Sequence, residues 1–377
     1  MKIKLVILLL LLCNCAFAQD TVYARKTLKK LTSPALWGRG YTKDGMGKAA
    51  TFIEKEFSKM GLSAQRQEFE FPVNTFPGNM SLTINGKKLK PGHDFLVSQA
   101  SKGLSASGVL AQEDSVNYSA ERQSLRILIQ PKLTWSVARR VEDFTEIIVK
   151  KGVLNQPPTQ FKTDIENRFV PSFKAFNVMS SVKGTKYPDS MLVLTAHYDH
   201  LGGMGRSTYF PGANDNASGV SLILDLARYY ARNPPAYTVV FICFAAEEAG
   251  LIGSKFFTEN PMIKLSNIRF LFNLDLVGTG DAGATVVNAT VHAKEFALLN
   301  KVNDEGKYLK KINSRGKAPN SDHYFFSEKG VPAFFLYTQG GISAYHDVDD
   351  KASTLPFTVY PKLFNLLVNF NKKLMAD

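Results

Sequence analysis

The sequence is poor in cysteine, with three in 377 residues. Cys13 and Cys15 lie in an N-terminal stretch that has the pattern of an export signal, so Cys243 is expected to be the only thiol of the mature chain. An internal disulfide framework is therefore excluded. Because Cys243 lies within the apolar stretch VVFICFAA, we expect a small buried hydrophobe there.

Acidic residues are in the minority, with 33 against 46 lysines and arginines, and the net charge is +13. The basic excess is spread along the chain and does not form a basic arm, so we expect no nucleic-acid partner. At 45% hydrophobic and 21% charged residues, the composition is that of a globular protein with a sizeable core. Disordered, collagen-like and coiled-coil chains are excluded.

Long apolar runs are also missing. The most apolar run, Leu5 to Leu12, is well short of the roughly 20 residues that a bilayer span requires. Lys2 and Lys4 precede it and Ala16-Phe17-Ala18 follows it, which is the pattern of a secretory signal peptide. We expect cleavage after Ala18, export, and no stable membrane span.

Under this hypothesis residues 1–18 are a signal peptide and residues 19–377 are the mature chain, located in the periplasm or secreted. A lipid anchor is disfavoured, because neither Cys13 nor Cys15 follows the small residue that normally precedes a lipidated cysteine.

The first part of the mature chain combines helices with short strands. Apolar residues recur at helical spacing from Asp20 to Leu31 and from Asp44 to Met60. Residues 75–172 contain turn signals and one predicted helix, Val137 to Lys151, but no group of metal-ligating residues. We interpret this tract as a small insertion without an assigned role.

The second part alternates apolar strands with helices, and strands so uniformly apolar are buried on both faces. The pattern predicts an α/β fold of three layers, α/β/α, around a mostly parallel or mixed sheet, with ligand sites at the carboxyl ends of the strands. The predicted strands are Met191–Ala196, Thr238–Ala246, Ile268–Leu274 and Ala333–Tyr337, and the predicted helices are Val220–Tyr230 and Val359–Leu374.

The first apolar strand runs into His197-Tyr198-Asp199-His200. Residues two apart in an extended chain share a face, so His197 and Asp199 are expected to point the same way. A carboxylate in that place can orient an imidazole that binds a metal. The alternative is a chance pattern at a solvated strand end, and His200 is expected to point away from His197 in a structural role.

Two further acidic motifs follow. Asp215 lies in the polar loop GANDNASG just before an apolar helix, where helix capping is the alternative role. Glu247 and Glu248 end the strand TVVFICFAA, and adjacent side chains there point to different sides. One carboxylate can then bind a metal while the other reaches a water molecule on it. Surface charge is the alternative interpretation.

The strand IRFLFNL ends in Asp275, and a glycine-flanked loop late in the chain contains Tyr345-His346-Asp347. Two histidines and three carboxylates form a ligand set suited to zinc. Five ligands exceed the three usual at a single catalytic zinc, which favours two metals with Asp215 as the bridge. The predicted ligands are His197, Asp215, Glu248, Asp275 and His346.

The motifs HYDHLG, GANDNASG, AAEEAGLIGS, NLDLVG and YHD, in this order, resemble the secreted di-zinc aminopeptidases of clan MH, which also holds glutaminyl cyclases and transferrin-receptor-like proteins. The likeness extends to LTSPALWGRGYTKDGMGKAATFIEKEFSKMGL near the N-terminus and to AFNVMSSVKG. It implies a zinc exopeptidase-like fold over residues 19–377 and hydrolysis of N-terminal residues from peptide substrates.

The resemblance also implies a role for each predicted ligand. His197 and Asp275 would hold one Zn²⁺, Glu248 and His346 would hold the other, and Asp215 would bridge the two.

Three further roles are carried over in the same way. Glu247 would be the general base, Asp199 would orient the imidazole of His197 without binding the metal itself, and Tyr345 would help to polarise the scissile carbonyl. Ser321-Asp322-His323 resembles a family motif in the wall of the site, with helix capping as the alternative.

Two rival functions use the same fold. A glutaminyl cyclase would use a single zinc and no hydrolytic water, and a binding protein would have lost its metals. Outside the site, His93 and His292 are expected to be structural, and neither Trp37 nor Trp135 carries a functional signal.

Overall fold

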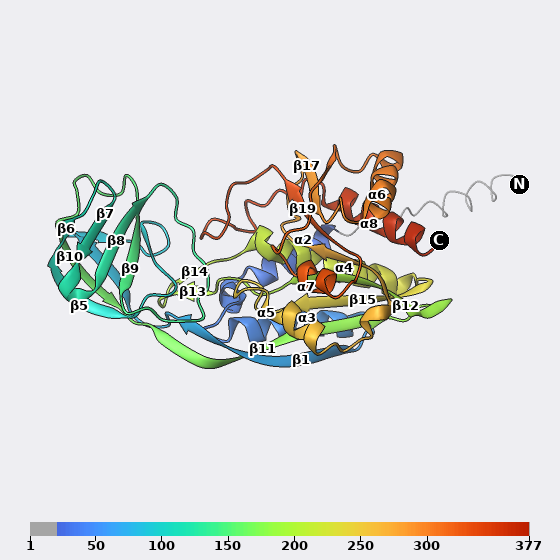
Figure 1. The fold of residues 1–377 in the computed structure, drawn as a ribbon, viewed down its shortest axis with the longest axis horizontal. Coiled ribbons are helices and arrows are strands. Elements are labelled where there is room, and N and C mark those ends of the chain that lie inside the picture. The colour runs from blue at the N-terminus through green and yellow to red at the C-terminus, as the bar shows by residue number, and fades with distance from the viewer. Residues whose placement is uncertain (1–20, 377) are drawn as a thin grey trace, which may run out of the picture.

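The computed structural model describes residues 21–376, so the predicted signal peptide lies outside the described residues. It contains a large α/β body and a strand-rich lobe at one end of it (Figure 1). Within the described part of the chain, we find no helix with the length and apolar character needed to cross a membrane.

The body is built on an eight-stranded sheet of mixed direction, which confirms the predicted fold class. The strand order is β1 (Ala64–Thr75), β11 (Arg168–Val182), β15 (Tyr237–Phe244), β12 (Tyr187–His197), β16 (Ile268–Leu274), β19 (Ala333–Gln339), β17 (Gly283–Val287) and β18 (Ile312–Ser314). β12 pairs in parallel with β15 and with β16, β16 pairs in parallel with β19, and β17 pairs in parallel with β18. The pairs β1–β11, β11–β15 and β17–β19 are antiparallel.

Helices cover both faces of this sheet. Successive strand residues point to opposite faces, so Leu194 packs in the larger core with most of the helices, while Val193 packs in a smaller core with Phe257 and Phe326. Phe257 lies on α5 (Ile252–Glu259) and Phe326 on α7 (His323–Glu328). The larger core contains residues of α2 (Thr21–Leu31), α3 (Gly45–Lys59), α4 (Ser218–Arg232), α6 (Ala293–Gly306) and α8 (Tyr360–Leu374).

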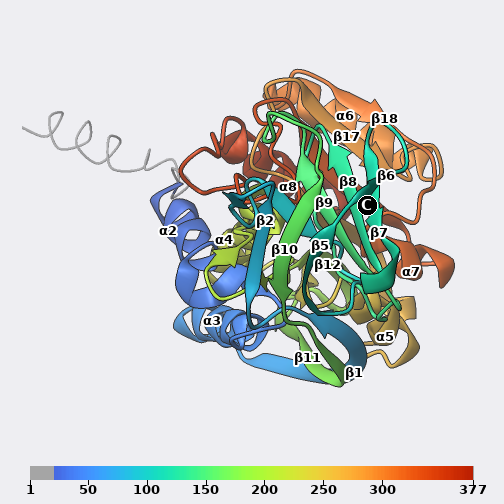
Figure 2. The same ribbon diagram turned by 90° about the vertical axis from the view of Figure 1, so that its left-hand side faces the viewer.

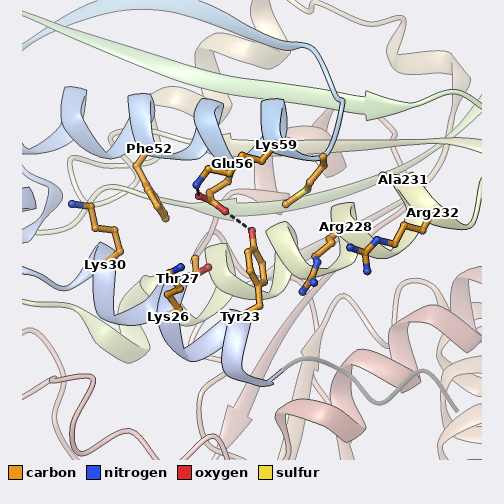
Figure 3. Close-up of a pocket in the computed structure, with 11 residues that line it drawn as sticks. Tyr23, Lys26, Thr27, Lys30, Phe52, Glu56, Lys59, Arg228, Ala231 and Arg232 are labelled. Atoms are coloured by element: carbon orange, nitrogen blue, oxygen red, sulfur yellow. Dashed lines mark hydrogen bonds and ion pairs between the residues drawn. The ribbon is translucent and has the colours of Figure 1, made fainter. Parts of the chain in front are cut away.

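Helices α2, α3 and α4 line an open cavity of about 560 Å³ (Figure 3). Basic side chains of Lys26, Lys59 and Arg232 line it, and the Tyr23 hydroxyl donates a 3.0 Å hydrogen bond to Glu56 inside it. None of the predicted site residues lines this cavity. It is therefore a feature of the outer helix layer and not of the predicted site.

The lobe (residues 76–165) has a hydrophobic core of its own. Phe95, Ile127 and Ile147 are buried there, and Phe210 and Val348 of the body close it. One sheet consists of β3 (Lys87–Leu89), β2 (Met80–Ile84), β10 (Gln160–Ile165) and β5 (Leu104–Val109). The other consists of β4 (Phe95–Val97), β9 (Thr145–Lys150), β8 (Leu125–Gln130), β7 (Asn117–Ala120) and β6 (Ala111–Gln112).

The predicted helix Val137–Lys151 is wrong. Its second half is the strand β9, which pairs in parallel with β8 and antiparallel with β4. The sequence TEIIVK alternates buried residues with half-buried or exposed ones and is rich in β-branched side chains, which favour a pleated surface. Residues 131–144, which precede this strand, are irregular.

The lobe lies beyond the carboxyl ends of the central parallel strands. β11 leaves the lobe after β10 and runs antiparallel to β15, so β15 and its parallel neighbour β12 both end on the side of the lobe. Figure 2 looks onto the lobe with the body behind it. Any site at these strand ends must therefore open between the body and the lobe.

Candidate active site

The predicted site residues come from loops at this edge of the sheet. His197 is the last residue of β12, Glu247 and Glu248 follow β15, and Asp275 follows β16. Asp215 lies in the turn Ala213–Ala217 that leads into α4. His346 comes from the loop after β19.

The structure brings the five predicted ligands together. The Nε2 atom of His197 lies 3.3 Å from Oδ1 of Asp215 and 3.4 Å from Oδ1 of Asp275. The Nε2 atom of His346 lies 3.0 Å from Oδ2 of Asp215 and 3.1 Å from Oε2 of Glu248. The two oxygens of Asp215 thus face different histidines, as a bridging carboxylate requires.

The arrangement suits cations. Ligand atoms of His197, Asp215 and Glu248 lie within 4.8 Å of one another, and so do those of His197, Glu247 and Asp275. Oδ1 of Asp275 is buried without a hydrogen-bond partner. Imidazole and carboxylate donors in this geometry fit zinc, and a bound cation would satisfy the unpaired oxygen.

The site carries an excess of buried negative charge. Burial disfavours the protonated ring of His346, but the charges of Glu248 and Asp215 outweigh it and raise the His346 pKa to about 11. Burial raises the pKa of Glu247 well above its usual range, although His197 opposes this. Cations would replace the protons that this charge otherwise attracts.

Asp199 holds the segment that carries the two glutamates. Its buried carboxylate accepts hydrogen bonds from the backbone N–H groups of Glu247 (3.1 Å) and Glu248 (3.3 Å) and from the Tyr41 hydroxyl (3.3 Å). Oδ1 of Asp199 also lies 3.6 Å from Nδ1 of His197. Asp199 therefore links one predicted ligand to the glutamate pair.

Asp199→Asn is expected to lower kcat/KM by about 10- to 100-fold, the usual cost of losing such a supporting group. The amide would place a donor where the native carboxylate accepts only N–H and O–H groups. Steady-state kinetics on the folded variant measure this, with Asp189→Asn at the exposed start of β12 as the control. Native kinetics in Asp199→Asn would contradict this role.

Arg39 was not identified from the sequence. It is fully buried at the end of the turn Pro34–Arg39, and burial lowers its pKa to about 10. Its guanidinium donates hydrogen bonds to the carbonyl oxygens of Pro211 (2.7 Å), Tyr198 (2.8 Å), Gly212 (2.8 Å), Leu31 (3.1 Å) and Asp215 (3.1 Å). This single side chain thus fixes the backbone just before the Asp215 turn and within it.

Arg39→Met is expected to lower the free energy of unfolding by about 3 kcal/mol or more, because five buried carbonyls would lose a charged donor. Urea denaturation measures the change. Arg140→Met, at a side chain 80% exposed, is the matched control. A loss as small as that of the control would mean that these hydrogen bonds contribute little.

Asp350 was also missed. Its carboxylate accepts hydrogen bonds from the backbone N–H groups of Asn214 (2.8 Å) and Asp215 (3.0 Å), and burial raises its pKa to about 6. The residue comes 135 positions after Asp215 in a loop without regular structure. No local sequence signal marks such a contact.

His200 lies closer to the site than expected. Its Nδ1 atom is 2.6 Å from Oε1 of Glu248, so it contacts a predicted ligand. The expectation that it points away in a structural role assumed an extended chain through residue 200. The strand β12 ends at His197, so the alternation of faces ends there as well.

The motif Ser321-Asp322-His323 lies in the wall of the site. The Ser321 hydroxyl donates to Oδ2 of Asp275 (3.2 Å). Asp322 precedes α7 but makes no side-chain capping hydrogen bond, so the helix-capping interpretation is wrong. Burial raises the Asp322 pKa to about 7.

Tyr345 stands at the mouth of the site. Its side chain is 43% exposed, and its ring stacks on that of His346 with centroids 4.0 Å apart and planes at 13°. Cys243 is fully buried in β15, as predicted. His93 and His292 lie outside the cluster, since neither contacts a predicted ligand in the described hydrogen bonds and ion pairs.

Curated relatives match a part of the chain. A "probable zinc metalloprotease" of Pyricularia oryzae is 41% identical over 114 residues, which are 29% of this chain and 23% of that protein. The aminopeptidase YwaD of Bacillus subtilis is 35% identical over 152 residues, 40% of this chain and 32% of that protein. The matched segment thus spans about a quarter to a third of these relatives.

Solved structures share the fold along almost the whole chain. A peptidase M28 precursor from Shewanella amazonensis superposes with a TM-score of 0.74 at 14% identity, over 95% of this chain and 94% of that one. A zinc aminopeptidase from Bacillus subtilis superposes with a TM-score of 0.72 at 18% identity, over 94% and 95%. At this level of identity the likeness concerns the fold.

The model of "Peptidase family M28" matches residues 177–370, slightly more than half of the chain. This range contains all of the strands β12, β15, β16 and β19 and every predicted ligand. By the order of its motifs, its fold and this match, the chain belongs to peptidase family M28.

Proposed function

We propose that this chain is an exported metallo-aminopeptidase that removes N-terminal residues from peptides with a pair of zinc ions. The observation that carries the proposal is that the two oxygens of Asp215 face two different histidines. One oxygen lies 3.3 Å from Nε2 of His197 and the other 3.0 Å from Nε2 of His346. A single-metal site does not need a carboxylate placed between two histidines.

Five side chains would hold the ions. His197 and Asp275 would bind one, Glu248 and His346 the other, and Asp215 both. When bound, two zinc ions lower the pKa of a shared water molecule and polarise the substrate carbonyl.

The chain itself supplies the proton transfer. Glu247 directly precedes Glu248 in the segment after β15, and its carboxylate lies within 4.8 Å of ligand atoms of His197 and Asp275. Its carboxylate takes the proton from the attacking water and passes it to the departing amine. The Tyr345 hydroxyl, at the mouth of the site, donates a hydrogen bond to the carbonyl oxygen as it gains negative charge.

Recognition of the substrate's free N-terminus needs acidic groups. The half-buried Glu247 and the region of the buried Asp275 would pair with the ammonium group, since both carboxylates lie beside the reacting centre. Two rival functions on this fold, a single-zinc glutaminyl cyclase and a metal-free binding protein, lack either the second metal or both.

For location, we propose that residues 1–18 direct export and that the mature enzyme acts in the periplasm or outside the cell. Expression of the full chain followed by N-terminal sequencing of the exported protein tests this. A mature N-terminus at Gln19 supports it, and an uncleaved chain retained in the cytosol contradicts it.

The activity is tested on the purified chain of residues 19–377. We expect two zinc ions per molecule, release of the N-terminal residue from aminoacyl amides and peptides, and no cleavage of the same peptides after N-acetylation. One zinc with pyroglutamate formation from N-terminal glutamine would support the cyclase, and no bound metal the binding protein.

Chelation gives an independent prediction. Prolonged dialysis against a chelator is expected to abolish hydrolysis, because every proposed step depends on the ions. Activity should return fully only near two equivalents of zinc per protein molecule. Hydrolysis that survives complete metal removal would contradict the proposal.

A further inference from the structure

We propose that the lobe completes the metal site, and that Trp135 is the positioning residue through which it holds His346. This inference rests on the proposed function, because it concerns the zinc ion assigned to Glu248 and His346. It assigns a role to residues 75–172, whose sequence indicated no function.

A reciprocal pair of hydrogen bonds joins the two residues. Nδ1 of His346 lies 3.0 Å from the backbone oxygen of Trp135, and the backbone N–H of Trp135 donates to the backbone oxygen of His346 at 2.9 Å. A carbonyl oxygen only accepts, so Nδ1 must carry the proton. When the ring loses its second proton to bind a metal, the lone pair is therefore on Nε2, which faces Asp215 and Glu248.

The backbone of His346 also needs support. Its φ of 53° is in the left-handed region, which residues other than glycine rarely adopt. The hydrogen bond from the backbone N–H of Trp135 fixes the backbone carbonyl of His346 itself. Both the ring and the backbone of His346 are thus held by one residue of the lobe.

Trp135 is itself anchored firmly. Its indole N–H donates to the backbone oxygen of Val97 in β4 at 2.7 Å. Its ring stacks on that of Phe210, in the body, with centroids 4.7 Å apart and planes at 19°. The side chain is only 5% exposed. A buried indole fixed to both parts of the molecule can hold its own backbone carbonyl in place.

A second contact ties the same two loops. The ammonium group of Lys132 donates to the backbone oxygen of Ser343 at 3.0 Å and lies 3.9 Å from Asp347. Residues 132–135 therefore contact the His346 loop before, at and after the histidine.

The other predicted ligands are supported from the body. His197 lies beside Asp199, Asp275 accepts a hydrogen bond from Ser321, and the Asp215 turn is fixed by Arg39. Only one of the two metal positions, that of Glu248 and His346, should therefore depend on the lobe.

The test is Trp135→Ala in the mature chain, with zinc affinities of both positions measured by chelator competition and with cobalt(II) spectra as a second readout. We expect zinc affinity at the position of Glu248 and His346 to fall by about 10- to 100-fold, the usual cost of losing a supporting contact, and affinity at the position of His197 and Asp275 to change by less than about 2-fold. The cobalt spectrum should change in the bands of one ion.

Phe161→Ala is the matched control, because Phe161 is buried in the same lobe core and its strand β10 pairs with β2 and β5, not with residues 132–135 or the His346 loop. It should lower the melting temperature but leave both zinc affinities native. Trp135→Phe, which keeps a stacking ring but loses the bond to Val97, should weaken the same position to a smaller extent and covers the case in which the alanine variant does not fold.

Native affinity at both positions in folded Trp135 variants would overturn the inference. Equal weakening in Phe161→Ala would do so as well, because it would show a general effect of lobe stability. The parent chain separates this outcome from a failure of the proposed function: if it binds two zinc ions and cleaves peptides, that proposal stands whatever Trp135 does.

Discussion

Glu247→Gln is expected to lower kcat by about 10²- to 10⁴-fold, the contribution of a positioned general base. The amide is nearly isosteric with the carboxylate but cannot accept the proton of the attacking water. The assignment leaves Glu247 out of the five ligands, so both zinc ions should remain. Turnover of an aminoacyl amide and metal analysis of the same preparation measure the two quantities together.

Glu305→Gln, on the exposed surface of α6, controls for the loss of one negative charge and should have native turnover. Native turnover in Glu247→Gln would remove the general-base assignment. Loss of a zinc ion in that variant would instead place Glu247 among the ligands, which its closeness to His197 and Asp275 makes a meaningful alternative outcome.

Asp215→Asn is expected to lower zinc affinity at both positions together, by on the order of 100-fold or more, which exceeds the usual cost of losing a supporting group. Asparagine has one oxygen in place of two and no negative charge. The histidines that now face different oxygens of Asp215 would no longer share an anionic partner. Titration of the apo-protein with zinc, followed by calorimetry, measures both affinities.

Asp304→Asn, also on the exposed face of α6, is the control for this change and should bind zinc as the parent does. If Asp215→Asn lost one ion and kept the other at native affinity, the carboxylate could not be the bridge. The folded state of each variant is checked by its melting temperature in the absence of metal.

The central strands were predictable because burial on both faces leaves a strong local pattern. Leu192 and Phe241 lie in stretches with hardly a polar residue, and the predicted ranges match β15, β16 and β19 closely. β12 begins at Tyr187, before the predicted start at Met191, because its first three residues are exposed and lack the apolar pattern.

Three of the predicted ligands, His197, Glu248 and Asp275, stand at or just after the ends of such strands, where a ligand site is expected. Asp215 and His346 lie in loops and were named from their residue types and motifs.

The lobe was harder to predict for a physical reason. Its strands are short and half-exposed, and β5 alternates half-buried and exposed residues without a fully buried one. The segment TEIIVK is rich in β-branched side chains, which favour a strand, and β8 and β4 pair with it on either side. The predicted helix Val137–Lys151 overlooked this short local signal.

The supporting residues of the site were missed because their partners lie far away along the chain. Arg39 acts on carbonyls more than 150 positions later, and its burial cannot be read from a charged residue in a polar turn. Trp135 reaches His346 across 211 positions. Such contacts depend on tertiary structure, whereas metal-ligand motifs depend on residue types and can be recognised locally.

Anomalous diffraction at the zinc edge, from crystals of the zinc-loaded mature chain, tests the central claim most directly. The account predicts two peaks, one beside His197 and Asp275 and one beside Glu248 and His346, each about 2.0–2.2 Å from an oxygen of Asp215. A single peak, or peaks that Asp215 does not bridge, would contradict it.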